Sequence, residues 1–250
     1  MSETDSTQPR AAEISNVLRD EILLGQYRVG ERLPSERDLA ARFSVNRGSV
    51  REAIKILAQL GIVTVQPGGV RIVALEEASL GILGPLLDLQ TAQRPNLVAD
   101  LVEVFGALLA LSAKLALQKA TPQQKKELVG LLSHTEQSPN GGSAADIDVC
   151  SPIDAKEEAL EQFFMALNQI NDNLVLRLIG NGLKTQILGR IERRNDPSPA
   201  FFDALARAVQ DDDAYALARA IIQRMEEVSH QLKTAGLKPQ DHLDRNTAHV

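Results

Sequence analysis

Apolar residues recur along this chain at two different spacings, and the change in spacing divides it. From about residue 79 onward they return every third or fourth position, as in Leu176, Ile179, Leu183 and Ile187, with no strand signal. That period predicts amphipathic helices. We expect them at residues 79–91, 95–119, 122–137, 153–171, 173–195, 200–210 and 213–235, after a first helix at about 10–25.

Residues 33–73 have another order, in which two short helices precede two alternating apolar strands around a Pro-Gly-Gly turn. Ser35 can cap the first helix, with the Asp38 carboxylate three residues on. Asn46 can cap the second. This order predicts a winged helix-turn-helix, a device that places one helix in the DNA major groove. The expected fold class is therefore mostly α: an N-terminal winged helix-turn-helix and a C-terminal all-α bundle.

The second helix of this motif has an apolar side, predicted to be buried, and a polar side. Arg47 and Arg51 lie one turn apart on the polar side, where we also expect Ser49. Arginines at the start of a recognition helix can fork onto a guanine edge or grip phosphate. Such a pair alone is also typical of a solvated face, so the interpretation depends on the whole motif. The predicted DNA contacts are Arg37, Asn46, Arg47, Gly48, Ser49, Arg51, Gln66, Gly68, Gly69 and Arg71.

The string LPSERDLAARFSVNRGSVREAIKILAQLGIV resembles the N-terminal domain of GntR-family bacterial transcription regulators. The resemblance covers about residues 12–73. It implies that Arg37, Arg47 and Arg51 contact DNA and that Ser49 meets a phosphate or a base. The wing departs from the family pattern, because Val70 and Arg71 stand where a glycine and a threonine are common.

Composition restricts the remaining choices. Residues 1–75 carry 10 Lys/Arg and 9 Asp/Glu, whereas the other 175 carry 17 and 24, so basic contacts to DNA must be local. A single cysteine, Cys150, excludes an internal disulfide framework and favours a reducing cytoplasm. No apolar run is long enough to span a bilayer. We expect a disordered leader at 1–9, the DNA-binding domain at 10–75, an effector and dimerisation domain at 76–237 and a disordered tail at 238–250.

Two helical segments resemble the FadR branch of that family: residues 79–110, and residues 163–191 with the run Leu178 to Lys184. Many members of this branch hold a divalent metal through an Asp and three His. The matching positions here carry Leu160, Phe164, about Phe202, and Arg224 or Met225, none of which suits such an ion. We expect neither a metal nor a cofactor.

Those replacements leave two interpretations open: the aromatic and methionine side chains line an apolar cavity, or they fill it as a packed core. Gly180 and Gly182 favour a ligand, because glycine inside a helix is costly unless something approaches the backbone. Lys184 follows on the same helix and can meet an anionic head group. The predicted effector contacts are Phe164, Gly180, Gly182, Lys184, Phe202, Ile222 and Met225.

The resulting prediction is a cytoplasmic bacterial transcription regulator, homodimeric on a short palindromic double-stranded DNA operator. The resemblance implies control by an acyl-type effector such as a long-chain acyl-CoA, although Ile222, Gln223 and Glu226 replace residues typical of acyl-CoA-binding relatives. The alternative is a DNA-binding regulator without a small molecule, controlled by a protein partner. No catalytic motif is present, so an enzyme is not expected.

Overall fold

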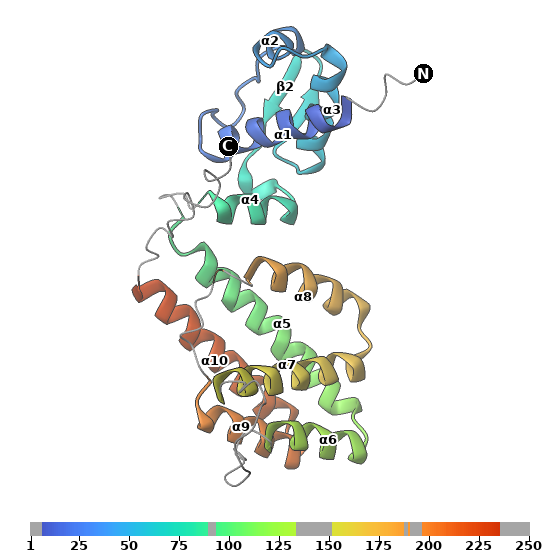
Figure 1. Ribbon diagram of the computed structural model, residues 1–250, viewed down its shortest axis with the longest axis vertical. Helices are drawn as coiled ribbons and strands as arrows, with labels where there is room; N and C mark the ends of the chain where they lie inside the picture. Colours follow the sequence, from blue (N-terminus) through green and yellow to red (C-terminus); the bar gives the residue numbers. More distant parts are fainter. Residues whose placement is uncertain (1–6, 90–93, 134–151, 188–189, 191–196, 236–250) are drawn as a thin grey trace, which may run out of the picture. The chain divides into compact units, whose positions relative to one another are not determined.

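The computed structural model describes residues 7–89, 94–133, 152–187, 190 and 197–235, which divide into two compact units, 1–94 and 95–250 (Figure 1). Helices dominate both units, and the described strands, β1 (Val63–Gln66) and β2 (Gly69–Ile72), lie in the first. The expected mostly α fold class is confirmed. The expected tail and most of the expected leader lie outside the described residues.

The first unit is built around a three-helix core of α1 (Thr7–Leu23), α2 (Glu36–Arg42) and α3 (Arg47–Gln59). Both α1 and α2 pack on α3, which also contacts β1. Leu18, Leu39, Val50 and Leu57 are completely buried where these elements meet. The apolar period of the sequence therefore identified the core side of α3 correctly, because a 3.6-residue repeat gathers these positions on one face.

Two strands form the wing of this unit. β1 pairs with β2 in antiparallel register, with Thr64 opposite Arg71 and Gln66 opposite Gly69. A short segment adds to the free edge of β2, because Arg32 forms a bridge with Arg71. The chain thus has the helix, turn, helix and wing order that the sequence predicted.

The boundary between the units lies further along the chain than the expected division at residue 75. Two 3-10 turns, η1 (Leu75–Glu77) and η2 (Leu80–Ile82), lead into α4 (Leu83–Asp88). The Ser79 amide donates to the Leu60 carbonyl over 2.9 Å, which ties this segment to the end of α3. Because that contact is between backbone groups, the apolar pattern gave no sign of it.

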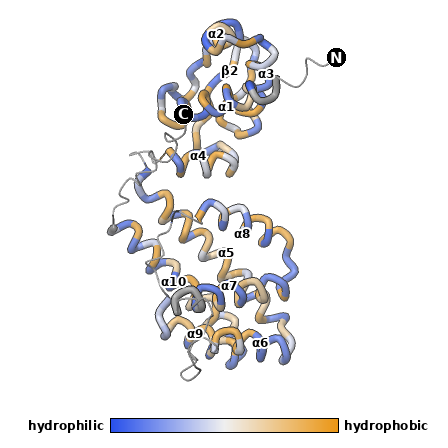
Figure 2. The backbone as a smooth tube through the Cα atoms, in the orientation of Figure 1, coloured by the Kyte–Doolittle hydropathy of each residue, from blue (hydrophilic) through white to orange (hydrophobic). Residues whose placement is uncertain are grey.

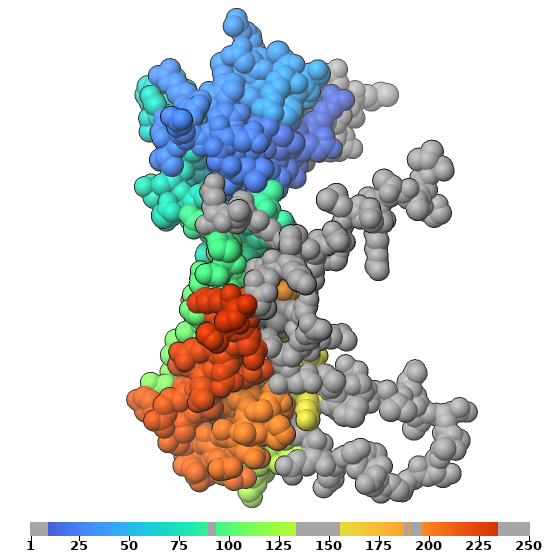
Figure 3. All heavy atoms as spheres, turned by 90° about the vertical axis from the view of Figure 1, so that its left-hand side faces the viewer, coloured from blue at the N-terminus to red at the C-terminus, as the bar shows by residue number. Residues whose placement is uncertain are grey.

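The second unit is a bundle of helices: α5 (Leu97–Lys119), α6 (Pro122–Ser133), α7 (Pro152–Asn171), α8 (Leu174–Ile187), α9 (Pro199–Gln210) and α10 (Ala214–Ala235). The long helix α5 packs against α7, α8 and α10 and is hydrophobic along most of its length (Figure 2). α9 and α10 lie side by side (Figure 3). None of the described helices is long and apolar enough to span a bilayer.

Helix starts in this unit follow local chemistry. Thr121 and Gln124 form reciprocal bonds at the start of α6, with the Thr121 amide donating to Gln124 Oε1 over 2.9 Å. Asp213 Oδ1 accepts the Ala216 amide at 2.8 Å and starts α10. Ser198 caps α9. These capping bonds account for the accuracy of the predicted helix starts.

Candidate nucleic-acid interface and helical-domain cavity

The start of α3 is fixed by its cap. Asn46 Oδ1 accepts the Ser49 amide at 2.8 Å and the Ser49 hydroxyl at 3.3 Å. A Cβ at Gly48 would approach Asn46 Oδ1 to 3.0 Å, so the glycine gives the capping carboxamide room. The cap therefore gives a structural reason for glycine at position 48, in addition to the predicted close approach of DNA.

The position expected for Ser49 was wrong. Its side chain is completely buried, with its hydroxyl on the cap, instead of exposed beside Arg47 and Arg51. A residue two positions after Arg47 lies about 200° around a helix of 3.6 residues per turn, almost on the opposite side. Ser49 therefore supports the start of α3 from inside.

The open side of α3 carries the arginine pair. Arg47 is exposed, and no ion pair joins it to the described residues. Arg51 is also exposed, with 63% of its side chain accessible, although its Nε donates to Glu36 Oε2 over 2.7 Å. Arg37, in the first turn of α2, is 78% exposed. Three guanidinium groups are thus accessible on the N-terminal parts of α2 and α3.

The wing has a thin, uncharged tip. Gln66, Gly68 and Gly69 are all exposed there, and both glycines have positive φ values, 97° and 132°. The predicted phosphate contact at Arg71 is used differently, because its Nη1 donates to the Gly30 carbonyl over 2.7 Å. Arg71 therefore ties the wing to the preceding segment, and only part of its guanidinium remains for another partner.

An ion pair braces α1 against α2 behind this surface. The Arg42 guanidinium binds both carboxylate oxygens of Glu21, and the Tyr27 hydroxyl donates to Glu21 Oε2 over 3.3 Å. The hydrogen bonds from Arg42 hold the pKa of Glu21 below its usual value. Burial raises the pKa of Tyr27. The α1–α2 contact therefore depends on an ionised carboxylate.

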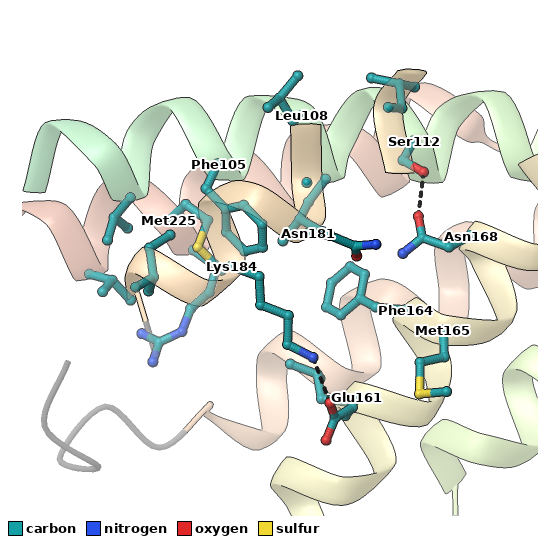
Figure 4. A pocket seen from close by; sticks show the side chains of 18 of the residues that line it. Phe105, Leu108, Ser112, Glu161, Phe164, Met165, Asn168, Asn181, Lys184 and Met225 are labelled. Atoms are coloured by element: carbon teal, nitrogen blue, oxygen red, sulfur yellow. Dashed lines mark hydrogen bonds and ion pairs between the residues drawn. The ribbon is translucent and has the colours of Figure 1, made fainter. Parts of the chain in front are cut away.

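The second unit contains a cavity of about 460 Å³ lined by α5, α7 and α8, with further side chains from α9 and α10 (Figure 4). Phe105 and Phe164 project into it from α5 and α7. Of the two interpretations left open by the sequence, the structure shows a cavity. Its other apolar walls are Val102, Leu108, Leu109, Leu160, Met165, Leu176, Ile187, Phe201, Met225 and Val228.

Four of the seven predicted effector residues line this cavity: Phe164, Gly180, Lys184 and Met225. The other three do not. Phe202 is buried in the core, and its neighbour Phe201 lines the cavity instead. Gly182 and Ile222 point elsewhere and are exposed. The error has one cause, because adjacent residues of a helix face about 100° apart and the period alone does not identify the wall.

The cavity has a polar side. Lys184 Nζ donates to Glu161 Oε1 over 2.6 Å, and Ser112 donates to Asn168 Oδ1 over 2.8 Å (Figure 4). Arg177, which the sequence did not indicate, also lines it. Its Nε is buried and has no hydrogen-bond partner among the described residues. A buried donor without a partner is costly, which makes Arg177 a ready anchor for an acceptor.

The positions that match the metal ligands of the FadR branch carry hydrophobic or cationic side chains, and most of them line this cavity. Leu160, Phe164, Arg224 and Met225 all line it. Within the described ranges, no three His, Cys, Asp or Glu side chains gather closely enough to hold an ion. The donor set therefore does not fit a divalent metal.

Comparison with protein families gives a match for "Bacterial regulatory proteins, gntR family" over residues 10–72, which covers the helices and wing of the first unit. The first unit is a gntR-family domain. Its helix, turn, helix and wing order agrees with that assignment.

Relatives extend beyond this gntR-family domain. An uncharacterized HTH-type transcriptional regulator of Mycobacterium tuberculosis is 32% identical over 138 residues, covering 54% of this chain and 56% of the relative. The Uxu operon regulator of Haemophilus influenzae is 32% identical over 123 residues, 46% of this chain and 45% of its own. The chain thus spans about half the length of these relatives. The solved structure of Streptococcus agalactiae GntR is 22% identical, with a TM-score of 0.41, over 88% of this chain and 99% of its own.

One residue of the gntR-family domain was missed by sequence reasoning. The Arg32 side chain lies against the wing tip, with Nη2 beside Gly68 and Cδ beside Gly69. Arg32 precedes the helix-turn-helix by a few positions, so the motif gave no reason to place it there. The signal that could have identified it is a cation on the strand that pairs with a wing whose tip carries no charge.

Proposed function

We propose that this protein is a sequence-specific DNA-binding transcription regulator that acts in the cytoplasm as a homodimer on a short palindromic operator. The observation that carries the proposal is the open side of α3, where Arg47 and Arg51 are exposed opposite a completely buried Val50 and Leu57. A recognition helix reads base edges with its N-terminal turns, which is where these arginines lie.

Most of the predicted contacts can be assigned a role in this proposal. Arg47 and Arg51 read base edges, and Arg37 fixes the register on a phosphate. The exposed Asn46 and Gly48 allow close approach at the helix start. Gln66, Gly68 and Gly69 form a tip thin enough for the minor groove. Ser49 has no direct contact, because its hydroxyl is buried.

The proposal is tested on a duplex that the full-length protein selects from a random library. Fluorescence anisotropy measures the affinity of each variant for this duplex. Arg47→Ala and Arg51→Ala should each lose about 1–3 kcal/mol of binding free energy. Lys55→Ala is the matched control, since Lys55 lies two turns into α3 and is paired with Glu52. Unchanged affinity in both arginine variants would refute the assignment of α3.

We propose further that the cavity binds a small apolar or acyl-type effector with an anionic head, and that the chain belongs to the FadR branch. The walls supply apolar surface from α5 and α7, which suits a hydrocarbon chain. The Arg177 Nε without a partner and Lys184 on the same helix suit the anionic head. A carboxylate there would compete with Glu161 for Lys184.

Control of DNA binding then requires that the effector bind the DNA-competent and DNA-incompetent arrangements with different affinities. A long-chain acyl-CoA is the first compound to test by titration calorimetry. Arg177→Met and Lys184→Met should each weaken its binding about tenfold or more, because each removes a charge-assisted hydrogen bond. Arg219→Met, an exposed cation on α10 outside the cavity, is the control.

Native mass spectrometry of protein purified from its own host gives an independent reading. A retained species of acyl mass supports the effector proposal. Protein without a small molecule, together with co-purification of one stoichiometric polypeptide, would favour control by a protein partner.

A further inference from the structure

Arg32 lies on a strand that extends the wing. The Leu33 amide donates to the Val70 carbonyl and the Ile72 amide donates to the Glu31 carbonyl, each over 3.0 Å. These bonds place Arg32 directly opposite Arg71 in an antiparallel bridge. Side chains opposite one another in such a pair project from the same face. Arg32, Arg71 and Thr64 therefore form a row on one face of a three-stranded wing.

The Arg32 side chain runs from this row toward the tip. Its Cδ lies 3.9 Å from where a Cβ of Gly69 would be, and its Nη2 lies 2.9 Å from where a Cβ of Gly68 would be. A side chain at position 68 would displace the guanidinium. The positive φ of Gly68 favours glycine, and its missing Cβ leaves room for the end of the Arg32 side chain.

The charges on this face are unbalanced. One guanidinium nitrogen of Arg71 donates to the Gly30 carbonyl. The Arg32 side chain has no ion pair or hydrogen bond with any described residue. The tip residues Gln66 to Gly69 carry no charge. Like charges placed directly opposite in a sheet destabilise it. That cost is offset when an anion lies against the pair.

We propose that Arg32 supplies the positive charge at the wing tip and contacts the phosphates that line the DNA minor groove beside the site of α3. Minor grooves concentrate negative potential and attract arginine. This inference rests on the proposed DNA-binding function and adds to it a second contact surface, formed by a residue outside the helix-turn-helix. Arg71 holds the strand that presents Arg32, so its part is positioning.

The test compares full-length wild type, Arg32→Ala and Arg32→Lys on the duplex selected by the wild-type protein, across a salt titration. Arg32→Ala should bind about tenfold more weakly and reduce the slope of log K against log salt by about 1, the loss of one phosphate contact. Arg32→Lys should retain most of the affinity, because a phosphate accepts either cation.

Arg28→Ala is the matched control, because it removes the same charge from the same segment. The backbone bonds that Arg28 makes with Glu31, at 2.8 and 2.9 Å, survive that substitution. Equal losses in Arg28→Ala and Arg32→Ala would reduce the effect to net charge and overturn the proposal.

A second substitution that restores the charge distinguishes an effect of charge on DNA binding from an effect of Arg32→Ala on local structure. Gln66 lies on the same face as Arg32 by the strand register, so Gln66→Arg in the Arg32→Ala background should recover affinity and slope. Wild-type affinity and slope in Arg32→Ala, with binding lost in Arg47→Ala, would overturn the role of Arg32 and leave the proposed function intact. If the wild type fails to prefer the selected duplex to a scrambled one, the proposed function itself fails.

Discussion

Arg51 on α3 donates through Nε to Glu36 Oε2 over 2.7 Å, so a carboxylate in the first turn of α2 holds one edge of the Arg51 guanidinium. An exposed pair of this kind adds little to stability. Its consequence is orientation, because the bond restricts an arginine side chain that stays 63% exposed. We interpret Glu36 as a residue that aligns Arg51 for a base edge.

Replacing Glu36 should therefore change specificity more than stability. Glu36→Gln removes a negative charge near the duplex, which raises non-specific affinity, and it weakens the hold on Arg51. The ratio of specific to non-specific affinity should fall by about tenfold, the effect of one misaligned base contact. Anisotropy with the selected and scrambled duplexes measures both. Glu52→Gln, whose partner Lys55 lies further along α3, should leave the ratio unchanged.

The capping bonds at the start of α3 should contribute to stability, and Ser49 should make no contact with DNA. Asn46→Ala removes the bond to the Ser49 amide and should cost about 1 kcal/mol of unfolding free energy. Ser49→Ala should alter stability modestly and leave the salt dependence of DNA binding unchanged, because its hydroxyl is buried. Urea unfolding and a salt titration make the two measurements. A reduced salt slope in Ser49→Ala would instead show that Ser49 contacts DNA.

The parts of this protein that the sequence predicted well are those fixed by local chemistry. Ser35 caps α2 and Asn46 caps α3 as expected, because a capping bond spans three residues. The bond from Arg71 to Gly30 joins residues 41 positions apart, and no local pattern contains it. The same holds for Arg32 at the wing tip, which depends on strand pairing.

In the helical unit the period of the sequence identified helices but not always the side they present. Phe201 and Phe202 both suit a buried position, and only the packing of α9 decides that Phe201 faces the cavity. Ile222 continued an apolar pattern yet is exposed. A hydrophobic repeat defines a broad stripe, and a cavity occupies only part of it.

Stability of the first unit should depend on pH through Glu21. Arg42 lowers the pKa of Glu21 from its ordinary value of 4.5, so the ion pair contributes its full stability above that value. The contribution is lost as pH falls through the lower pKa of the folded protein. Wild type should therefore lose more thermal stability than Glu21→Gln does as pH falls below the ordinary value of 4.5.

Arg42→Gln provides the complementary control for that titration. It removes the partner instead of the carboxylate, so the pKa of Glu21 should return toward its ordinary value and the extra acid sensitivity should disappear. Parallel pH profiles for wild type and both variants would show that another group controls acid unfolding of this unit.

The crossing of α5 and α10 depends on a glycine. A Cβ at Gly106 would overlap the first two side-chain carbons of Met225, so the helices approach as closely as they do only because position 106 lacks a side chain. Gly106→Ala should cost about 1–3 kcal/mol through overpacking and displace Met225 from the cavity wall. Gly130→Ala on α6 is the control: its Cβ meets nothing within 4 Å, so it should gain stability. Chemical unfolding of the two variants should move in opposite directions.

Alanine substitutions at Gly180 and Gly182 distinguish the destabilisation that glycine causes inside a helix from a role of glycine in ligand binding. A Cβ at either position meets nothing within 4 Å, so an alanine at each should stabilise the protein without effector by about 0.5–1 kcal/mol. Only Gly180 lines the cavity. Gly180→Ala should therefore weaken binding of an acyl-CoA several-fold, since one methyl group displaces about one methylene of buried chain, whereas Gly182→Ala should not. Calorimetric titration of both proteins measures the difference. Equal affinities would mean that the ligand does not approach the α8 backbone, and that Gly180 has no more functional reason to be glycine than Gly182.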